Sequence, residues 1–290
     1  MQACAGRFSR ISDRRVATLP ADRHRGDAAT HPEARLPMTE QAITVQAITK
    51  PPLDRLAVGI TGLTKHFAAT AALQDIALEL APGALFGLVG ANGAGKTTLI
   101  KCLLDLCAYE SGRIEIFGVA STLTVARKRL AFLPERFVPP YYLTGADFLR
   151  FMLRLYGRRY DTAEAFAMLD ALDLAREALV KPVRAFSKGM TQKLGLAACL
   201  MSGRELLVLD EPTSGLDPKA RALLKAQLKR LHETGRTLFL TSHSLSDVEE
   251  LCDEMAVLHQ GGLRFVGTPA ELKQRHAATG LEQAYLACIA

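Results

Sequence analysis

The feature that most constrains this chain is a glycine-rich octapeptide that stands between an apolar run and a helical pattern. Residues 90–97 read GANGAGKT and match the pattern G-x-x-x-x-G-K-[ST] at every defined position. The run GALFGLVG (83–90) is typical of a short buried strand, and residues 96–107 carry apolar side chains at helical spacing. A strand, a glycine-rich turn and a helix in this order predict a mostly parallel α/β sheet.

The same octapeptide predicts a phosphate-binding loop. Glycines let the backbone curl so that successive N–H groups point at phosphate oxygens, and the following helix adds its positive N-terminal end. Lys96 would supply a point charge to the β- and γ-phosphates of a nucleotide, Thr97 a hydroxyl for Mg²⁺, and Thr98 a contact to the α-phosphate. The expected nucleotide-binding residues of the loop are Gly90, Asn92, Gly93, Ala94, Gly95, Lys96, Thr97 and Thr98. The alternative is a glycine-rich turn before an ordinary helix.

An acidic pair after a second apolar run supplies the carboxylates that such a loop needs. Residues 206–209 are apolar and lead into Asp210 and Glu211. Because ligands bind at the carboxyl ends of parallel strands, we expect Asp210 to hold Mg²⁺, through water. We expect Glu211 to be the general base that polarises the attacking water. Alone, this pattern more often marks a strand end with solvated charges, but the glycine-rich loop upstream favours the nucleotide interpretation.

Strands and helices alternate along the chain from about residue 56. Residues 254–267 are typical of a hairpin with a Gly-Gly turn, and two short helices close the chain. Residues from about 123 to 201 are mostly helical and resemble an insertion in the core. We therefore predict one α/β domain over residues 56–290, with a helical subdomain over about 123–201 inserted in it.

Residues 1–55 differ from the rest of the chain. They contain Arg-rich and Pro-containing stretches without a sustained period, which predicts a disordered extension. The alternative is that translation starts at Met38 and that residues 1–37 do not belong to the native protein. Acidic residues interrupt the basic stretches, which disfavours a transit peptide, and the apolar core of a secretory signal is missing.

Charge and composition disfavour several classes of function. The net charge is +6, but residues 1–55 hold nine Lys/Arg and six Asp/Glu, which leaves 27 against 24 for residues 56–290. The domain is nearly balanced in charge, and the whole chain has 6% aromatic residues and no tryptophan, which together predict no nucleic-acid partner. No run of 18 apolar residues occurs, so no membrane span is expected in this chain. The six cysteines form no C-x-x-C pair and are expected to be buried reduced thiols.

Further motifs surround the acidic pair in a definite order. FSKGMTQK (186–193) precedes it, with Ser187 23 residues before Asp210. SGLD (214–217) follows it, and His243 ends the next predicted strand. The order resembles that of the ATP-binding subunits of ABC transporters, and the likeness covers about residues 56–290.

The resemblance assigns a name to each motif and implies a fold. The acidic pair matches the family's Walker B carboxylates, FSKGM its signature loop, SGLD its D-loop and His243 its switch histidine. The implied fold is that of ABC ATPases, in which a P-loop core with a mostly parallel sheet carries an N-terminal antiparallel β region and an inserted helical subdomain.

The resemblance also implies roles for four residues outside the loop and the acidic pair. In the family the signature loop binds the γ-phosphate held by the other subunit, which would be the role of Ser187 and Gly189 here. His243 would stabilise the transition state, and Phe67, 23 residues before Gly90, would lie against adenine. Each has a plainer alternative, namely a helix cap, a structural histidine and a core aromatic residue.

Two departures from the family pattern bear on activity. LAFLPERF places Glu135 where the family carries a glutamine, so a carboxylate that binds Mg²⁺ stands near Glu211 and could slow hydrolysis. Lys188 and Met190 replace a glycine and a glutamine of the signature loop. These departures resemble bacterial exporter-type ATPases. The implied catalytic residues are Glu211, His243 and Lys96, and the implied metal ligands are Thr97, Glu135 and Asp210.

The resemblance implies an ATPase with ATP and Mg²⁺ as ligands, which dimerises around ATP and drives a separate multi-span permease, in the export direction. Such a subunit would lie in the cytoplasm, on the inner face of the cell membrane through its permease. The main alternative is a non-transport ABC ATPase that acts on the ribosome or on DNA, which a single cassette without a long coiled coil disfavours. A nucleotide-gated binding module with little turnover and a simple P-loop kinase are further alternatives.

Overall fold

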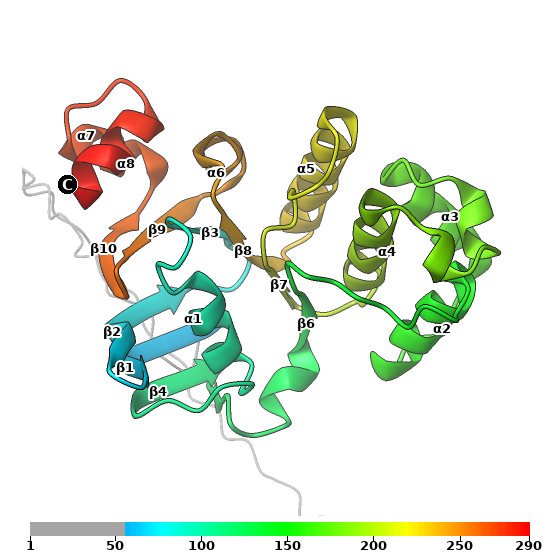
Figure 1. The fold of residues 1–290 in the computed structure, drawn as a ribbon, viewed down its shortest axis with the longest axis horizontal. Helices are drawn as coiled ribbons and strands as arrows, with labels where there is room; N and C mark the ends of the chain where they lie inside the picture. Colours follow the sequence, from blue (N-terminus) through cyan, green and yellow to red (C-terminus); the bar gives the residue numbers. More distant parts are fainter. Residues whose placement is uncertain (1–55) are drawn as a thin grey trace, which may run out of the picture. The chain divides into compact units, whose positions relative to one another are not determined.

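The structure is a computed structural model that describes residues 56–290, and these belong to one compact unit. The expected extension over residues 1–55 and the proposed start at Met38 lie outside the described residues. Figure 1 shows the arrangement of the helices and strands.

A six-stranded sheet forms the centre of the domain, in the order β10-β9-β3-β8-β7-β6. Its strands are β3 (Leu85–Val89), β6 (Leu130–Leu133), β7 (Leu206–Leu209), β8 (Thr237–Ser242), β9 (Glu254–His259) and β10 (Gly262–Gly267). All neighbours pair in parallel except β9 and β10. Strands β3, β7 and β8 are buried along their whole length, which explains their unbroken apolar runs.

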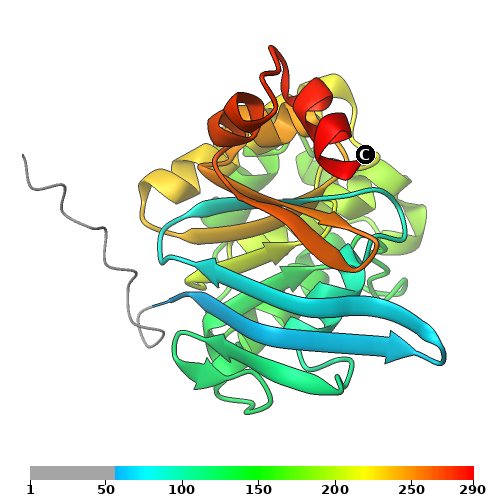
Figure 2. The same cartoon turned by 90° about the vertical axis from the view of Figure 1, so that its left-hand side faces the viewer.

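A second sheet of four antiparallel strands, in the order β2-β1-β4-β5, confirms the expected N-terminal antiparallel region. Its strands are β1 (Val58–Phe67), β2 (Thr70–Leu80), β4 (Ser111–Ile116) and β5 (Val119–Ala120). Helix α1 (Lys96–Leu103) shares one apolar cluster with this sheet and with one face of the central sheet, including Phe86 and Phe239. Figure 2 shows β1 and β2 as long neighbouring strands of this layer.

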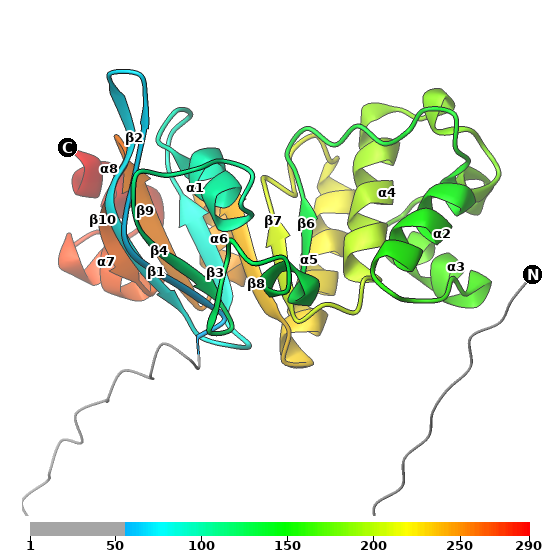
Figure 3. The same ribbon diagram turned by 90° about the horizontal axis from the view of Figure 1, so that it is seen from below.

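The remaining helices cover the other face of the central sheet, and some of them form a group beyond one edge of that sheet. They are α2 (Gly145–Leu155), α3 (Thr162–Ala171), α4 (Lys188–Leu200), α5 (Pro218–Glu233), α6 (Leu245–Leu251), α7 (Pro269–Arg275) and α8 (Leu281–Ile289). Short 3₁₀ turns occur at η2 (Ala126–Arg129), η3 (Arg176–Leu179) and η4 (Val183–Ala185). Figures 1 and 3 show α2, α3 and α4 grouped beyond β6 and β7, away from the antiparallel sheet.

Three local features differ from the sequence-based expectations. Strand β6 lies inside the stretch 123–201 that was expected to be mostly helical, and it pairs with β7 in the central sheet. Helix α1 ends at Leu103, because Asp105 adopts a left-handed conformation with φ +58°. In the β9–β10 hairpin the turn residues with positive φ are Gln260 and Gly261 rather than two glycines.

The described cysteines are free thiols, as expected from their spacing. Burial raises the pKa of Cys102 and that of Cys199 to about 12, so both stay protonated at neutral pH. Cys107 and Cys288 are only partly buried, and Cys4 lies outside the described residues. Within residues 56–290, none of the helices has the length and apolar character needed to cross a membrane.

Candidate active site

The glycine-rich loop connects β3 to α1, as its position between two predicted elements requires. Gly95 caps α1 with φ +114°, a conformation that side chains rarely adopt. At Gly90 the constraint is space, because a Cβ there would lie 2.3 Å from the carbonyl oxygen of Leu258 at the end of β9. The curl of the loop therefore depends on glycine at both positions, for different physical reasons.

Lys96 lies in the first turn of α1 with only 6% of its surface exposed. Its ammonium donates a hydrogen bond to the carbonyl oxygen of Gly90, at 2.6 Å, so the side chain folds back over the loop. The same Nζ is 3.6 Å from Oε1 of Glu211. It also lies 3.5 Å from the carbonyl oxygen of Ala91. A buried cation with two carbonyls and one carboxylate beside it is a strong anchor for further negative charge.

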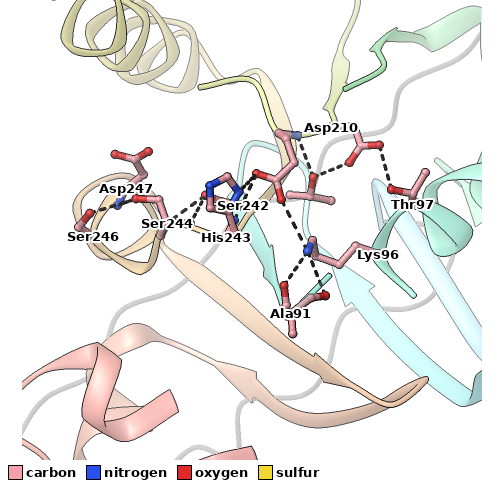
Figure 4. A network of polar contacts seen from close by, with 12 residues as sticks. Ala91, Lys96, Thr97, Asp210, Ser242, His243, Ser244, Ser246 and Asp247 are labelled. Atoms are coloured by element: carbon pink, nitrogen blue, oxygen red, sulfur yellow. Dashed lines mark hydrogen bonds and ion pairs between the residues drawn. The ribbon is translucent and has the colours of Figure 1, made fainter. Parts of the chain in front are cut away.

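Asp210 follows β7 and is 2% exposed. Its Oδ1 accepts a hydrogen bond of 2.6 Å from the hydroxyl of Thr241, and its Oδ2 lies 3.3 Å from the hydroxyl of Thr97, which donates to it. Thr241 stands on the neighbouring strand β8, and its Oγ1 accepts the backbone N–H of Glu211 at 2.9 Å. Figure 4 shows Asp210 and Thr97 facing each other, with Lys96 nearby.

Thr241 is the site residue that the sequence analysis missed. It is fully buried and holds both members of the acidic pair, one through its hydroxyl hydrogen and the other through its oxygen. The signal was a hydroxyl residue in the apolar run TLFLTS before His243. Thr241 reaches the acidic pair only because β8 lies beside β7, and the sequence pattern does not predict which strands are neighbours.

Glu211 contacts both Lys96 and His243. It is 6% exposed and has φ +50°, a left-handed conformation that costs a non-glycine residue roughly 1–3 kcal/mol. Its Oε2 is 2.7 Å from Nδ1 of His243 and accepts the His243 backbone N–H at 3.2 Å. The strained backbone turns the carboxylate toward Lys96 and His243, and such strain is characteristic of functional sites.

A cavity of about 740 Å³ opens over the loop and connects these groups. Residues from five segments of the chain line it, namely Phe67, Thr70, Ala71, Ala72, Ala91, Asn92, Gly93, Gly95, Lys96, Thr97, Thr98, Glu135, Glu211 and His243. Asp210 lies behind the cavity wall, in contact with Thr97. The fold thus brings Phe67, Glu135 and His243 to the glycine-rich loop, although they are far apart in the sequence.

Ser187 and Gly189 do not line this cavity. Ser187 caps helix α4, and its hydroxyl accepts the backbone N–H of Met190 at 3.2 Å. Gly189 lies near Gly215, whose carbonyl oxygen is 3.7 Å from the position of a Cβ on Gly189. The signature loop and the D-loop segment therefore adjoin one another in this chain, apart from the glycine-rich loop.

The donors around Thr97 fit a magnesium ion. The Thr97 hydroxyl and the Asp210 carboxylate face each other, and both are hard oxygen donors of the kind that Mg²⁺ prefers. Among residues 56–290 no group of three His, Cys, Asp or Glu side chains is arranged to enclose a metal. Mg²⁺ usually keeps several waters and takes its other ligands from one or two carboxylates and from substrate phosphates.

Known proteins share the sequence pattern of this chain. The sequence model of the ABC transporter family matches residues 73–214. Nod factor export ATP-binding protein I of Bradyrhizobium diazoefficiens is 34% identical over 238 residues, which cover 80% of this chain and 77% of that protein. The linearmycin resistance ATP-binding protein LnrL of Bacillus subtilis is 32% identical over 239 residues, which cover 78% and 76%.

Solved structures share the fold. The structure of an ATP-binding subunit of an ABC transporter superimposes with a TM-score of 0.74 at 28% identity, over 80% of this chain and 99% of that chain. The similarity thus extends over the central sheet, the antiparallel sheet and the helices, and not only over the residues of the glycine-rich loop.

Proposed function

This chain belongs to the ABC transporter family of ATP-binding proteins, and on that premise we propose that two copies close around ATP to drive a separate permease that exports its substrate. The chain is an ATPase. The names of two relatives, a Nod factor exporter subunit and a linearmycin resistance protein, support the export direction. The partner would hold the chain in the cytoplasm, at the inner face of the cell membrane.

The placement of Glu211 carries the proposal. Its carboxylate lies within 3.6 Å of Lys96 and 2.7 Å of His243, at the wall of the cavity over the glycine-rich loop. In our proposal the Glu211 carboxylate accepts a proton from the attacking water. Lys96 binds the β- and γ-phosphates, and His243 orients Glu211 and stabilises charge on the γ-phosphate.

The other contacts of the nucleotide follow from the residues around the cavity. Thr97 and Asp210, with Glu135 at the rim, hold Mg²⁺, which neutralises charge on the phosphates when it is bound. The backbone N–H groups of Gly93 and Gly95 and the hydroxyl of Thr98 bind phosphate oxygens, with Gly90, Asn92 and Ala94 shaping the loop around them. The exposed ring of Phe67 stacks on the adenine.

The position of Ser187 supports an ATP-dependent dimer. Helix α4 presents an N-terminus with Ser187 and Gly189, but this anion-binding end does not line the cavity of its own chain. The N-terminus of α4 would contact the γ-phosphate bound by a second copy of the chain. In the proposed dimer, each site combines the glycine-rich loop of one copy with the signature loop of the other.

Exposed apolar side chains in the loop that follows Glu135 support a permease partner. Val138, Tyr141 and Tyr142 are 87%, 67% and 69% exposed, and they follow Glu135 in the same loop. Phe137 of this loop packs on Phe148 of α2, with ring centroids 5.5 Å apart. The loop therefore connects the cavity wall to the helical subdomain, and a partner on Val138, Tyr141 and Tyr142 would sense closure around ATP.

The test is capture of the partner from native membranes by a tagged Glu211→Gln chain held with ATP and Mg²⁺. We expect a membrane protein with several spanning helices, and we expect Tyr141→Asp with Tyr142→Asp to abolish its capture while ATP binding persists. Ribosomal or DNA-bound partners without a membrane protein would overturn the transporter role and favour the non-transport alternative.

Glu135 provides a separate prediction about Mg²⁺. Replacing Glu135 by glutamine removes one negative charge from the cavity rim, so the Mg²⁺ concentration for half-maximal ATPase activity should rise about tenfold. The measurement is a Mg²⁺ titration of steady-state ATP hydrolysis. Glu282→Gln, at an exposed position on α8, is the matched control. An unchanged rate and an unchanged Mg²⁺ dependence would remove Glu135 from the metal site.

A further inference from the structure

The tip of the β1–β2 hairpin presents Phe67 to the cavity. Phe67 pairs with Thr70 across a two-residue turn in which Ala68 has φ +52°. Its ring is 51% exposed and lines the cavity together with the glycine-rich loop. A half-exposed ring at a hairpin tip has few neighbours that fix its orientation. The few side chains that do contact the ring therefore determine how well a flat ligand can stack on it.

One charged group contacts the Phe67 ring from outside the cavity. The ammonium of Lys65 lies over the ring, 5.1 Å from its centroid. Lys65 does not line the cavity, whereas Phe67 does. The ammonium therefore attracts the electrons of the ring face that it covers, without itself lining the cavity.

Glu110 fixes Lys65 in this position. Its Oε1 accepts a hydrogen bond from Lys65 Nζ at 2.9 Å, and its Oε2 accepts the backbone N–H of His66 at 2.8 Å. The backbone N–H of Glu110 donates to the carbonyl oxygen of Thr64 at 3.0 Å. The side chain of Lys65 is only 12% exposed. Three contacts from Glu110, which lies just before β4, thus hold the end of β1 from which the Phe67 ring projects.

We propose that Lys65 and Glu110 are positioning residues for the nucleobase, holding the Phe67 ring in the orientation in which a purine stacks on it. This inference rests on the proposed nucleotide-binding function and deepens it. Drawing ring electrons toward Lys65 strengthens stacking of the electron-rich adenine on the opposite face. The two residues then contribute to affinity for the base and contribute nothing to affinity for the triphosphate.

The titration of the pair agrees with a permanent contact. The hydrogen bond with Lys65 holds the pKa of Glu110 below its ordinary value, and the hydrogen bond with Glu110 raises the pKa of Lys65. Both groups therefore stay charged through the neutral range.

The test compares ATP with inorganic tripolyphosphate, which has the phosphates and lacks the base. In the full chain, Lys65→Met keeps the apolar stem and removes the cation. It should raise KM for ATP about threefold with kcat unchanged, and it should leave the inhibition constant of tripolyphosphate unchanged. Glu110→Gln should give the same pattern. Lys101→Met, at an exposed position of α1, is the matched control.

A double-mutant cycle with Phe67→Ala separates this inference from the function on which it rests. Phe67→Ala should raise KM for ATP about tenfold or more, and Lys65→Met should then have no further effect, because it acts through the ring. If Phe67→Ala leaves KM unchanged, both base stacking and this inference are wrong. If Phe67→Ala raises KM but Lys65→Met does not, or if Lys65→Met weakens tripolyphosphate equally, only the positioning role is overturned.

Discussion

Replacing Glu211 by glutamine is expected to lower kcat for ATP hydrolysis by roughly 10²–10⁴-fold, while ATP still binds. Glutamine has nearly the same shape, so the Thr241 contact to the backbone N–H of residue 211 should persist. What is lost is the negative charge that lies beside Lys96 and His243 and that would accept the proton of the attacking water. With binding intact and turnover stopped, the ATP-bound dimer should accumulate.

Two measurements check this prediction. Steady-state hydrolysis gives the loss in kcat, and size-exclusion chromatography with ATP and Mg²⁺ gives the fraction of dimer. Glu233→Gln, at an exposed position at the end of α5, is the matched control and should hydrolyse ATP at the wild-type rate as a transient dimer. A Glu211→Gln chain with normal kcat would show that another group accepts the proton.

Replacing Gly90 by alanine should have the second largest effect, because it combines a loss of stability with a loss of binding. The new Cβ would be 2.3 Å from the carbonyl oxygen of Leu258, a backbone atom that cannot rotate away. Either the loop or the end of β9 must shift, at a cost of about 1–3 kcal/mol in the free energy of unfolding. Since Lys96 is bound to the carbonyl of Gly90, a shifted loop also displaces the ammonium.

Urea unfolding and equilibrium ATP binding measure the two effects separately. We expect Gly90→Ala to weaken ATP binding by at least about tenfold, since losing a hydrogen bond to a charged group such as the Lys96 ammonium costs about 1.5 kcal/mol or more. Gly280→Ala is the matched control, because an added Cβ there meets nothing within 4 Å. If Gly90→Ala bound ATP with wild-type affinity, the end of β9 would have shifted and the glycine-rich loop would have kept its conformation.

Local chemistry explains why much of the site could be predicted. The loop between β3 and α1 needs glycines and a lysine at definite spacings, since its function depends on backbone N–H groups of neighbouring residues. The same holds for Ser187 as the cap of α4 and for the apolar run that precedes Asp210, both of which the structure contains. Such features depend on residues a few positions apart, so a single sequence carries them.

Errors arose where a short apolar segment could belong to either type of element. Strand β6 has four residues, too few to distinguish a period of two from one of 3.6, and so it was included in the helical stretch. Its partner β7 decides the matter, because the ladder from Leu130 to Leu133 satisfies backbone groups that a helix would otherwise satisfy. The pairing lies more than seventy residues away in the chain.

The sequence by itself determined the phosphate loop, the acidic pair, the order of the motifs and the alternation of strands and helices. Each motif and each element is a contiguous segment, so it can be identified from residues that are close together in the chain. The tertiary structure alone decided that Thr241 joins Asp210 to Glu211, that Glu110 fixes Lys65 beside Phe67, and that Ser187 stays outside the cavity. These relations follow from the order in which strands pair and sheets pack. That order is set by burial of the whole core rather than by any local pattern.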